Sequence, residues 1–381
     1  MALLETDNDS AALKEPAPNT LLKPKKLEDG LGLSLSGGGY RAMLFHLGAF
    51  YRLNELGLLS KIKRIASVSG GSLAAAALAI GWNNLKFDSE GIAENLTAAV
   101  SEPLLNLADR NIDIKAIALG LLPGLNAARV AAHFYDRFLC YGAKLQDLPG
   151  SPKFVFIATN LQTGSIWRFS KEYAADYQVG QWFKPDLPLS TILSASAGFP
   201  PYLSPCRISV PDGNIKITEG ATLNRFPFNR HLVLTDGGVY DNLGLEPIWK
   251  RYKTLLVSDG GALSGHQVTP SANWLLQSIR VNSIAMQQVI FLRKRFLRDV
   301  DSSNDRDVLV WSISEPLRTQ SLAFSSENAN YAASVPTRLA KLNPATKQLI
   351  LKSGYIHCTN ALASSTLEMT NCIPDCSVLP L

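Results

Sequence analysis

Residues 31–71 read LGLSLSGGGYRAMLFHLGAFYRLNELGLLSKIKRIASVSGG and predict two strand-turn-helix units in succession. Leu31–Leu35 alternates leucine with glycine and serine and runs into three glycines, which predicts a strand and a turn. Tyr40–Leu59 then carries apolar residues at helical spacing. Ile62–Val68 is a short β-branched run that indicates a second buried strand, and Ser72–Ile80 is an alanine-rich helix. Strands that alternate with helices favour a parallel sheet.

Both turns of this stretch belong at the edge of the sheet where α/β folds place their functional sites, the carboxyl ends of the strands. One turn, Gly37 to Gly39, offers bare backbone N–H groups, and the other offers Ser69. A serine hydroxyl attacks a carbonyl only when it is held and deprotonated. The resulting oxyanion needs fixed donors, worth about 3–4 kcal/mol each. We therefore expect the backbone of Gly37, Gly38 and Gly39 to form an oxyanion hole for Ser69.

Four segments, in order along the chain, resemble those of the patatin-like phospholipase family. They are SGGGYRA at residues 36–42, SVSGG at 67–71, SASAGFPP at 194–201 and DGG at 236–238. The resemblance spans roughly residues 31–263, and the ordered set is more specific than any single segment. It implies an α/β fold with three α/β/α layers around a mainly parallel central sheet. It also implies a lipid acyl hydrolase that uses a Ser-Asp dyad and needs no cofactor or metal.

The resemblance gives each matching residue a role. Ser69 is the implied nucleophile, Asp236 the implied base, and Gly37 to Gly39 the oxyanion hole, with Arg41 and Gly71 as supporting residues. The implied substrate is a membrane phospholipid or another acyl lipid, reached by peripheral contact with the membrane. Whether an activating partner or ligand is needed is left open.

The serine turn departs from the usual family pattern and contains a second serine. Ser67 stands where the family usually has glycine, and Ser36 and Ala42 also differ from the common residues. All three are small, so the tight turn is not blocked. Ser72 fits a loose Gly-x-Ser-x-small pattern, but an elbow places its nucleophile directly after the strand. We therefore expect Ser69 to be the nucleophile and Ser72 to bond a backbone group.

A second Asp-Gly-Gly sequence competes for the role of the base. Asp236 follows a predicted strand at residues 231–235, and Asp259 lies just after another at residues 254–257. An Asp-Gly turn is common in loops, so neither pattern alone indicates catalysis. The resemblance favours Asp236, because in the family the acidic turn after the next strand is not the base.

Other functions fit parts of the pattern. A Ser-His-Asp esterase would need a histidine after the acid, and His266 is the better placed candidate. A non-catalytic lipid-binding protein could keep the fold, although it would not need the serine, glycines and aspartate together. A dinucleotide site would need an acid at the end of the second strand, where Ser69 stands instead. The first two are kept as alternatives.

The composition fits one large globular domain. The chain has 381 residues, of which 46% are hydrophobic and 18% charged. No linker-like stretch lies within residues 30–365. We predict a mobile N-terminal arm at 1–29, a single catalytic domain at 30–365 and a C-terminal tail at 366–381. The net charge of +5 weakly favours an anionic membrane surface and is too diffuse to indicate nucleic acid.

The sequence also predicts a location. Five cysteines, few and odd in number, favour a reducing compartment. The N-terminus lacks the basic start and apolar run of a secretory signal. No segment reaches the ~18–20 apolar residues of a membrane span. We expect a cytoplasmic protein that contacts membranes peripherally.

Three further segments carry structural predictions. Residues 208–210 and 215–217 flank a Pro-Asp-Gly turn and predict a β-hairpin. Trp274–Leu297 predicts a long amphipathic helix with cations near its end, which suit the helix dipole; a membrane-facing basic patch is the alternative. Ile114–Leu125 predicts a buried helix, with a lid beside a lipid site as the alternative.

Overall fold

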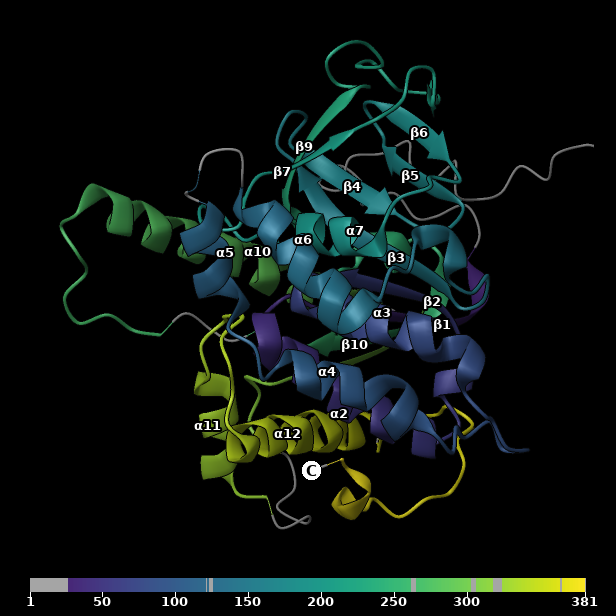
Figure 1. Ribbon diagram of the computed structural model, residues 1–381. Helices are drawn as coiled ribbons and strands as arrows, with labels where there is room; N and C mark the ends of the chain where they lie inside the picture. The colour runs from purple at the N-terminus through teal and green to yellow at the C-terminus, as the bar shows by residue number, and fades with distance from the viewer. Residues whose placement is uncertain are drawn as a thin grey trace, which may run out of the picture.

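A mixed sheet with parallel central strands forms the centre of the computed structural model, which describes residues 27–120, 122, 126–261, 265–302, 306–317, 324–363 and 365–380 (Figure 1). Parallel strands run in the order β11-β10-β1-β2-β3, and β4-β5-β6-β8 continue the sheet with antiparallel pairing. β9 also pairs with β3, and β7 pairs with β9. The strands are β1 (Glu28–Leu35), β2 (Ile62–Val68), β3 (Lys153–Asn160), β4 (Ser165–Phe169), β5 (Tyr173–Asp176), β6 (Gly180–Phe183), β7 (Cys206–Ser209), β8 (Ile215–Lys216), β9 (His231–Asp236), β10 (Tyr252–Asp259) and β11 (Asp307–Ser312).

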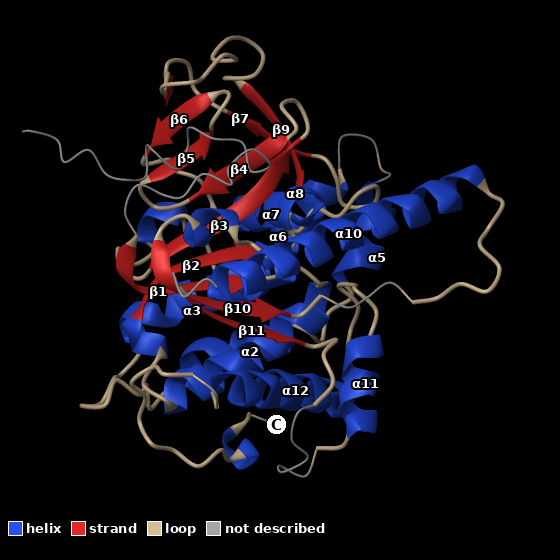
Figure 2. Ribbon diagram, turned by 180° about the vertical axis from the view of Figure 1, so that it is seen from behind, coloured by secondary structure: helices blue, strands red, loops and turns tan. Residues whose placement is uncertain are grey.

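Helices cover both faces of the sheet and complete three layers (Figure 2). α2, α3 and α12 pack in the larger hydrophobic core on one face, and α9 and the end of α10 pack in a second core on the other. The predicted α/β architecture with a mainly parallel sheet is thus confirmed. The helices are α2 (Gly39–Glu55), α3 (Gly70–Gly81), α4 (Glu102–Leu107), α5 (Ile112–Gly120), α6 (Ala127–Tyr135), α7 (Leu189–Ser196), α8 (Gly238–Asp241), α9 (Glu246–Trp249), α10 (Trp274–Ser302), α11 (Ser326–Ser334) and α12 (Pro344–Leu362).

The alternating sequence of β1 follows from the two unequal cores. Leu33 and Leu35 point into the larger core, since successive side chains of a strand face opposite sides. Gly32 faces the smaller core, where an added Cβ would lie 2.9 Å from Tyr252 and 3.1 Å from Ile248. The glycine therefore lets α9 approach the sheet closely.

α2, the helix that follows the glycine turn, is almost entirely buried, because α12 covers the face that the sheet leaves open. The two helices cross at a pair of glycines. A Cβ on Gly48 would lie 2.0 Å from the Leu351 carbonyl oxygen, and one on Gly354 would lie 1.9 Å from that of Phe45. Larger residues at either position would push the helices apart.

Two local predictions are wrong. The predicted hairpin does not form, because β7 pairs with β9 whereas β8 pairs with β6. Short apolar runs indicate strands but not their partners. The predicted buried helix after Ile114 is only half-buried, since Ile114 and Leu119 of α5 are exposed while Ile112 and Ala116 are buried; residues 121 and 123–125 lie outside the described residues.

The two ends of the predicted domain differ in what the structure describes. Most of the predicted arm, residues 1–26, lies outside the described residues. The predicted tail lies against α2 and the residue that follows this helix, Leu56. The Thr370 N–H donates to the Leu56 carbonyl, and Arg52 of α2 donates to the Cys372 carbonyl. None of the helices in the described part of the chain combines the length and apolar character that crossing a bilayer requires.

Candidate active site

Ser69 lies on a strained turn between β2 and α3. Its backbone angles, φ 52° and ψ −120°, are rare for a residue with a side chain, and such strain costs on the order of 1–3 kcal/mol. The next two residues must be glycine. A Cβ on Gly70 would lie 2.1 Å from the Gly39 carbonyl oxygen, and one on Gly71 would lie 2.4 Å from that of Leu35. This sharp strand-to-helix turn is typical of a nucleophile elbow.

The glycine loop after β1 lies beside Ser69. A Cβ on Gly37 would be 3.2 Å from the Ser69 Cβ, and Gly38 (φ 148°) and Gly39 (φ 61°) have left-handed backbones that favour glycine. The Gly37 N–H donates to the Asn242 carbonyl at 3.0 Å. The N–H groups of Gly38 and Gly39 have no acceptor within the described residues. Of the three expected donors, two are therefore free, and Gly37 supplies the close approach.

Asp236 reaches the same place from β9. Because β9 runs antiparallel to β3, Asp236 pairs with Ala158 near the carboxyl end of β3, the neighbour of β2, which ends just before Ser69. Its Oδ1 accepts the Gly238 N–H at 2.7 Å, and its Oδ2 has no hydrogen-bond partner within the described residues. Burial raises the pKa of Asp236 to about 6, although the Gly238 N–H and the nearby Ser69 hydroxyl each lower it. Such a carboxylate is a stronger base than usual.

Arg41 ties the glycine loop to the end of β10. Its Nε donates to the Gly260 carbonyl at 3.1 Å, and its guanidinium also bonds the Val335 carbonyl and the Thr337 hydroxyl. Burial lowers the pKa of Arg41 to about 10. The side chain thus braces the glycine loop against the end of β10 and against residues 335–337.

Asp259, the rival acid, has a cation as its partner. Its Oδ2 lies 2.5 Å from the Lys294 Nζ and accepts the Ser312 hydroxyl at 2.9 Å, while its Oδ1 accepts the Gly261 N–H at 2.9 Å. Both of its oxygens are therefore occupied. The Ser69 hydroxyl lowers the pKa of Asp236 and so lies close to that carboxylate.

Ser196 is a positioning residue that sequence reasoning did not single out. Its hydroxyl accepts the Ser69 N–H at 3.1 Å, contacts the Ser72 hydroxyl at 2.9 Å and donates to the Ile157 carbonyl at 2.6 Å. It anchors the elbow to β3. Ser72 is fully buried in this network and also bonds the Ser67 hydroxyl. The segment at residues 194–201 was the only sequence signal for it.

His46 is a second such residue, behind the glycine loop. Its Nε2 lies 2.9 Å from the Ser36 carbonyl oxygen and its Nδ1 lies 2.7 Å from the Ser258 hydroxyl. Burial lowers the pKa of His46 to about 4, so the ring is neutral, with Nε2–H as donor to Ser36. It holds the carbonyl just before the glycines, and nothing in its sequence position signalled this role.

A cavity of about 220 Å³ lies in front of these groups. Ser69, Asp236, Gly37 and Gly38 lie on one side of it, and one face of α10 lines another. The lining from α10 and from residue 199 is largely apolar: Phe199, Met286, Ile290 and Phe291, with Ser283, Gln287 and Lys294.

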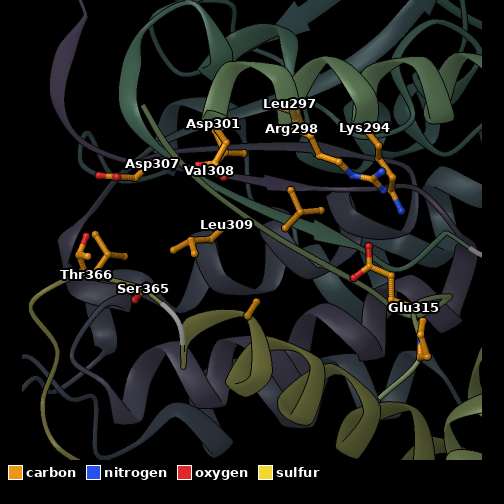
Figure 3. Close-up of a pocket in the computed structure, with 14 residues that line it drawn as sticks. Lys294, Leu297, Arg298, Asp301, Asp307, Val308, Leu309, Glu315, Ser365 and Thr366 are labelled. Atoms are coloured by element: carbon orange, nitrogen blue, oxygen red, sulfur yellow. Dashed lines mark hydrogen bonds between the residues drawn. The ribbon is translucent and has the colours of Figure 1, made fainter. Parts of the chain in front are cut away.

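A larger cavity, about 630 Å³, lies between α10 and the end of α12, along the edge strand β11 (Figure 3). Charged groups of both signs line it, among them Arg298, Asp301 and Glu315. It touches neither the serine turn nor the glycine loop. The volume of a cavity therefore does not identify the candidate site. The reactive groups that line the smaller cavity identify it.

The histidine alternative finds no support in the geometry. His266 is exposed and does not line the cavity beside Ser69. His357 is buried in α12, and burial lowers its pKa to about 4. Within the described residues, no group of three or more His, Cys, Asp or Glu side chains is arranged to hold a metal ion.

The fold and the site define a class of protein. It has three α/β/α layers, with a serine elbow beside a glycine loop at the carboxyl ends of parallel strands. Residues 33–249 match the family model for patatin-like phospholipases, which is more than half of the chain. The chain belongs to the patatin-like phospholipase family, and the activity at family level is lipid acyl hydrolysis. The resemblance expected from the sequence is confirmed. No curated protein matched in the corresponding comparison.

Solved structures with a similar fold include human GIVD cytosolic phospholipase A2, with a TM-score of 0.50, 12% identity and coverage of 93% of this chain and 62% of that chain. Its complex with methyl gamma-linolenyl fluorophosphonate gives a TM-score of 0.51 and 14% identity over 93% and 60% of the two chains. VipD from Legionella pneumophila gives 0.39 and 13% over 90% and 68%. This chain thus spans about three-fifths of the human protein's length in these structures, and the likeness is one of fold.

Proposed function

We propose that this chain hydrolyses carboxylic ester bonds of phospholipids or related acyl lipids, with Ser69 as nucleophile and Asp236 as base. One observation carries the proposal: the strained Ser69 lies beside a buried carboxylate that has an oxygen without a partner in the described residues. Membership of the family supports the substrate class. The proposal includes peripheral contact with a membrane, where such lipids lie.

The acylation step needs only these groups. Ionised Asp236 accepts the proton of the Ser69 hydroxyl as its Oγ attacks the ester carbonyl carbon. The carbonyl oxygen takes the negative charge, and the free N–H groups of Gly38 and Gly39 are its donors. As the C–O bond breaks, Asp236 returns the proton to the departing alcohol or lysolipid. The acyl group is left on Ser69.

Deacylation repeats the sequence with water. Asp236 takes a proton from the water that attacks the acyl carbonyl, and the same donors hold the oxyanion. The Ser69 oxygen leaves with that proton, and the fatty acid is released. Since no histidine relays the proton, the carboxylate must contact each hydroxyl directly.

The apolar lining of the cavity suits an acyl chain. Phe199, Met286 and Ile290 are among the side chains that line it. A fatty acyl chain gains about 0.8 kcal/mol for each CH₂ that it buries. This selects for lipid esters over short polar ones.

Labelling with a fluorophosphonate tests the nucleophile, since human GIVD cytosolic phospholipase A2 forms a complex with such a compound. We expect wild-type protein and Ser72→Ala to be labelled and Ser69→Ala to be unlabelled. Peptide mapping identifies the labelled serine. Label that persists in Ser69→Ala and disappears in Ser72→Ala would refute the assignment.

A second measurement separates the alternatives. Phospholipid hydrolysis by wild type and by His266→Ala at equal rates supports the dyad, whereas loss of activity in a folded His266→Ala supports a Ser-His-Asp esterase. Phospholipid vesicle binding without labelling or hydrolysis would indicate a lipid-binding protein that has kept the fold.

A further inference from the structure

The two halves of α10 differ in how far they are covered by the rest of the protein. Near its carboxyl end Leu297 is buried in the smaller core, Arg293 pairs with Glu246 and Lys294 pairs with Asp259. The amino-terminal half projects from the body of the protein (Figures 1 and 2). In that half most of the large apolar side chains are exposed to solvent.

The most exposed apolar residues of the helix lie on one line. Trp274, Val281 and Leu292 are 74%, 60% and 58% exposed. They are spaced by seven and eleven residues, which are close to two and three full turns. These three residues form the outer stripe, on the side of the helix away from the cavity, which Met286 and Ile290 line.

A second line connects the outer stripe to the cavity mouth. Ile284 and Phe291, again seven residues apart, lie on the flank between the two faces. Both are exposed, and Phe291 also lines the cavity beside Ser69. Apolar surface therefore runs from the solvent side of α10 to the candidate site.

Arginines lie on that same flank. Helical spacing places Arg280 one turn before Ile284, and Arg295 one turn after Phe291. The two acids of the helix, Asp299 and Asp301, lie in its last turn, far from the projecting half. The exposed surface thus combines bulky apolar groups, including a tryptophan, with positive charge. Amphipathic helices with this composition lie in the interface of anionic membranes.

We propose that the exposed side of α10, from Trp274 in the projecting half to Arg295, docks the protein on an anionic lipid bilayer, with the outer stripe inserted among the acyl chains and Arg280 and Arg295 on the headgroups. This inference rests on the proposed function, because it identifies the surface from which the substrate enters. The Ile284–Phe291 flank is then the path of a lipid from the bilayer into the cavity.

Vesicle binding tests the docking surface independently of catalysis. All variants are made in a Ser69→Ala background, and binding is measured by co-sedimentation with vesicles of equal parts phosphatidylcholine and phosphatidylglycerol. We expect Val281→Glu/Leu292→Glu to lower the affinity at least tenfold, since charge at the acyl level is unfavourable. The matched control is Ile217→Glu, at a 72% exposed isoleucine next to β8, at the opposite end of the sheet from β11. Equal affinity of the two variants would overturn the proposal.

Two further readouts identify the mode of binding. Vesicles should shift the tryptophan emission of the background protein to the blue, and Trp274→Phe should remove most of that shift. Arg280→Gln/Arg295→Gln should weaken binding to the anionic vesicles by about fivefold per arginine and leave binding to pure phosphatidylcholine unchanged. An emission shift that survives in Trp274→Phe would overturn the insertion.

A second copy of the chain is the other occupant that an apolar stripe could have. Sedimentation analysis decides this: a wild-type dimer that Val281→Glu/Leu292→Glu converts to monomers would overturn the docking proposal. Failure of the proposed function is distinguished with Ser69 intact. The double variant should hydrolyse a water-soluble short-chain ester at the wild-type rate and lose activity only on vesicles. An inactive wild type whose Ser69→Ala form binds vesicles through the stripe would refute the function alone.

Discussion

The turns Asp236-Gly237-Gly238 and Asp259-Gly260-Gly261 have the same sequence, lie at the ends of two successive strands of the chain, β9 and β10, and have equally buried aspartates. In each, the aspartate Oδ1 accepts the N–H of the second glycine, at 2.7 Å and 2.9 Å. The two aspartates differ in what contacts the other oxygen, Oδ2. That of Asp259 is held by Lys294 and Ser312, whereas that of Asp236 has no hydrogen-bond partner in the described part of the chain.

The difference shows that the same local structure can place its carboxylate in two different environments. A buried carboxylate with a cation is neutralised and braces the structure, here by tying β10 to α10 and β11. A buried carboxylate without a cation has a raised pKa and is a strong base. The expected consequence is a separation: substitution of Asp236 should damage activity, and substitution of Asp259 should damage stability.

The largest expected effect is on activity. Asp236→Asn removes the base and should lower kcat/KM for a soluble ester by about 10³-fold or more. Asp259→Asn should keep activity within about tenfold of wild type at a temperature where it is folded, because it lacks contact with the serine. Steady-state kinetics on both variants make the comparison. Similar losses in the two would contradict the assignment of the base.

The next effect is on stability at the rival turn. Asp259→Asn leaves the mostly buried Lys294 without its counter-ion and should lower the free energy of unfolding by about 3 kcal/mol, as measured by urea denaturation at pH 7. Asp259→Asn/Lys294→Met removes both charges and should recover most of the loss. A single variant as stable as wild type would mean that the ion pair does not brace the sheet.

Substitution of the candidate base, Asp236, should instead increase the free energy of unfolding. Folding raises the pKa of Asp236, so its ionised form is disfavoured in the folded protein. The free-energy cost of ionising Asp236 in the folded protein is absent below its pKa in the unfolded chain, near 4. It grows as the pH rises to about 6 and is complete above that. Asp236→Asn should therefore raise the free energy of unfolding by about 3 kcal/mol at pH 8 and change it little at pH 4. Thermal or urea unfolding at the two pH values checks this, and a variant that is destabilised at pH 8 would rule it out.

The smallest effect is on the pH profile of the wild type. A base with a pKa of about 6 must be ionised to act, so kcat/KM should rise with pH and level off above about 6. At pH 5 it should be about a tenth of its value at pH 7. A profile that stays flat down to pH 4.5 would indicate a base with an ordinary carboxyl pKa.

The elbow, the glycine loop and the fold class were predictable because they depend on residues close together in the chain. Ser69 follows its strand directly, and the backbone strain at that position and the glycines after it are local features. The order of the four matching segments indicated the family. The choice between Gly37 and its neighbours as donors was not predictable, because it depends on the carbonyl of Asn242, which only the fold brings to the Gly37 N–H.

The sequence by itself determined where a strand ends in a serine, where glycines allow close approach and where an acid precedes two glycines, since spacing and residue size decide these. Only the tertiary structure decided which Asp-Gly-Gly turn lacks a cation. It also showed that β7 and β8 do not form a hairpin, and that the first half of α10 leaves its apolar side uncovered. Each of these depends on partners distant in the chain, and a local pattern carries no information about which distant groups will meet it.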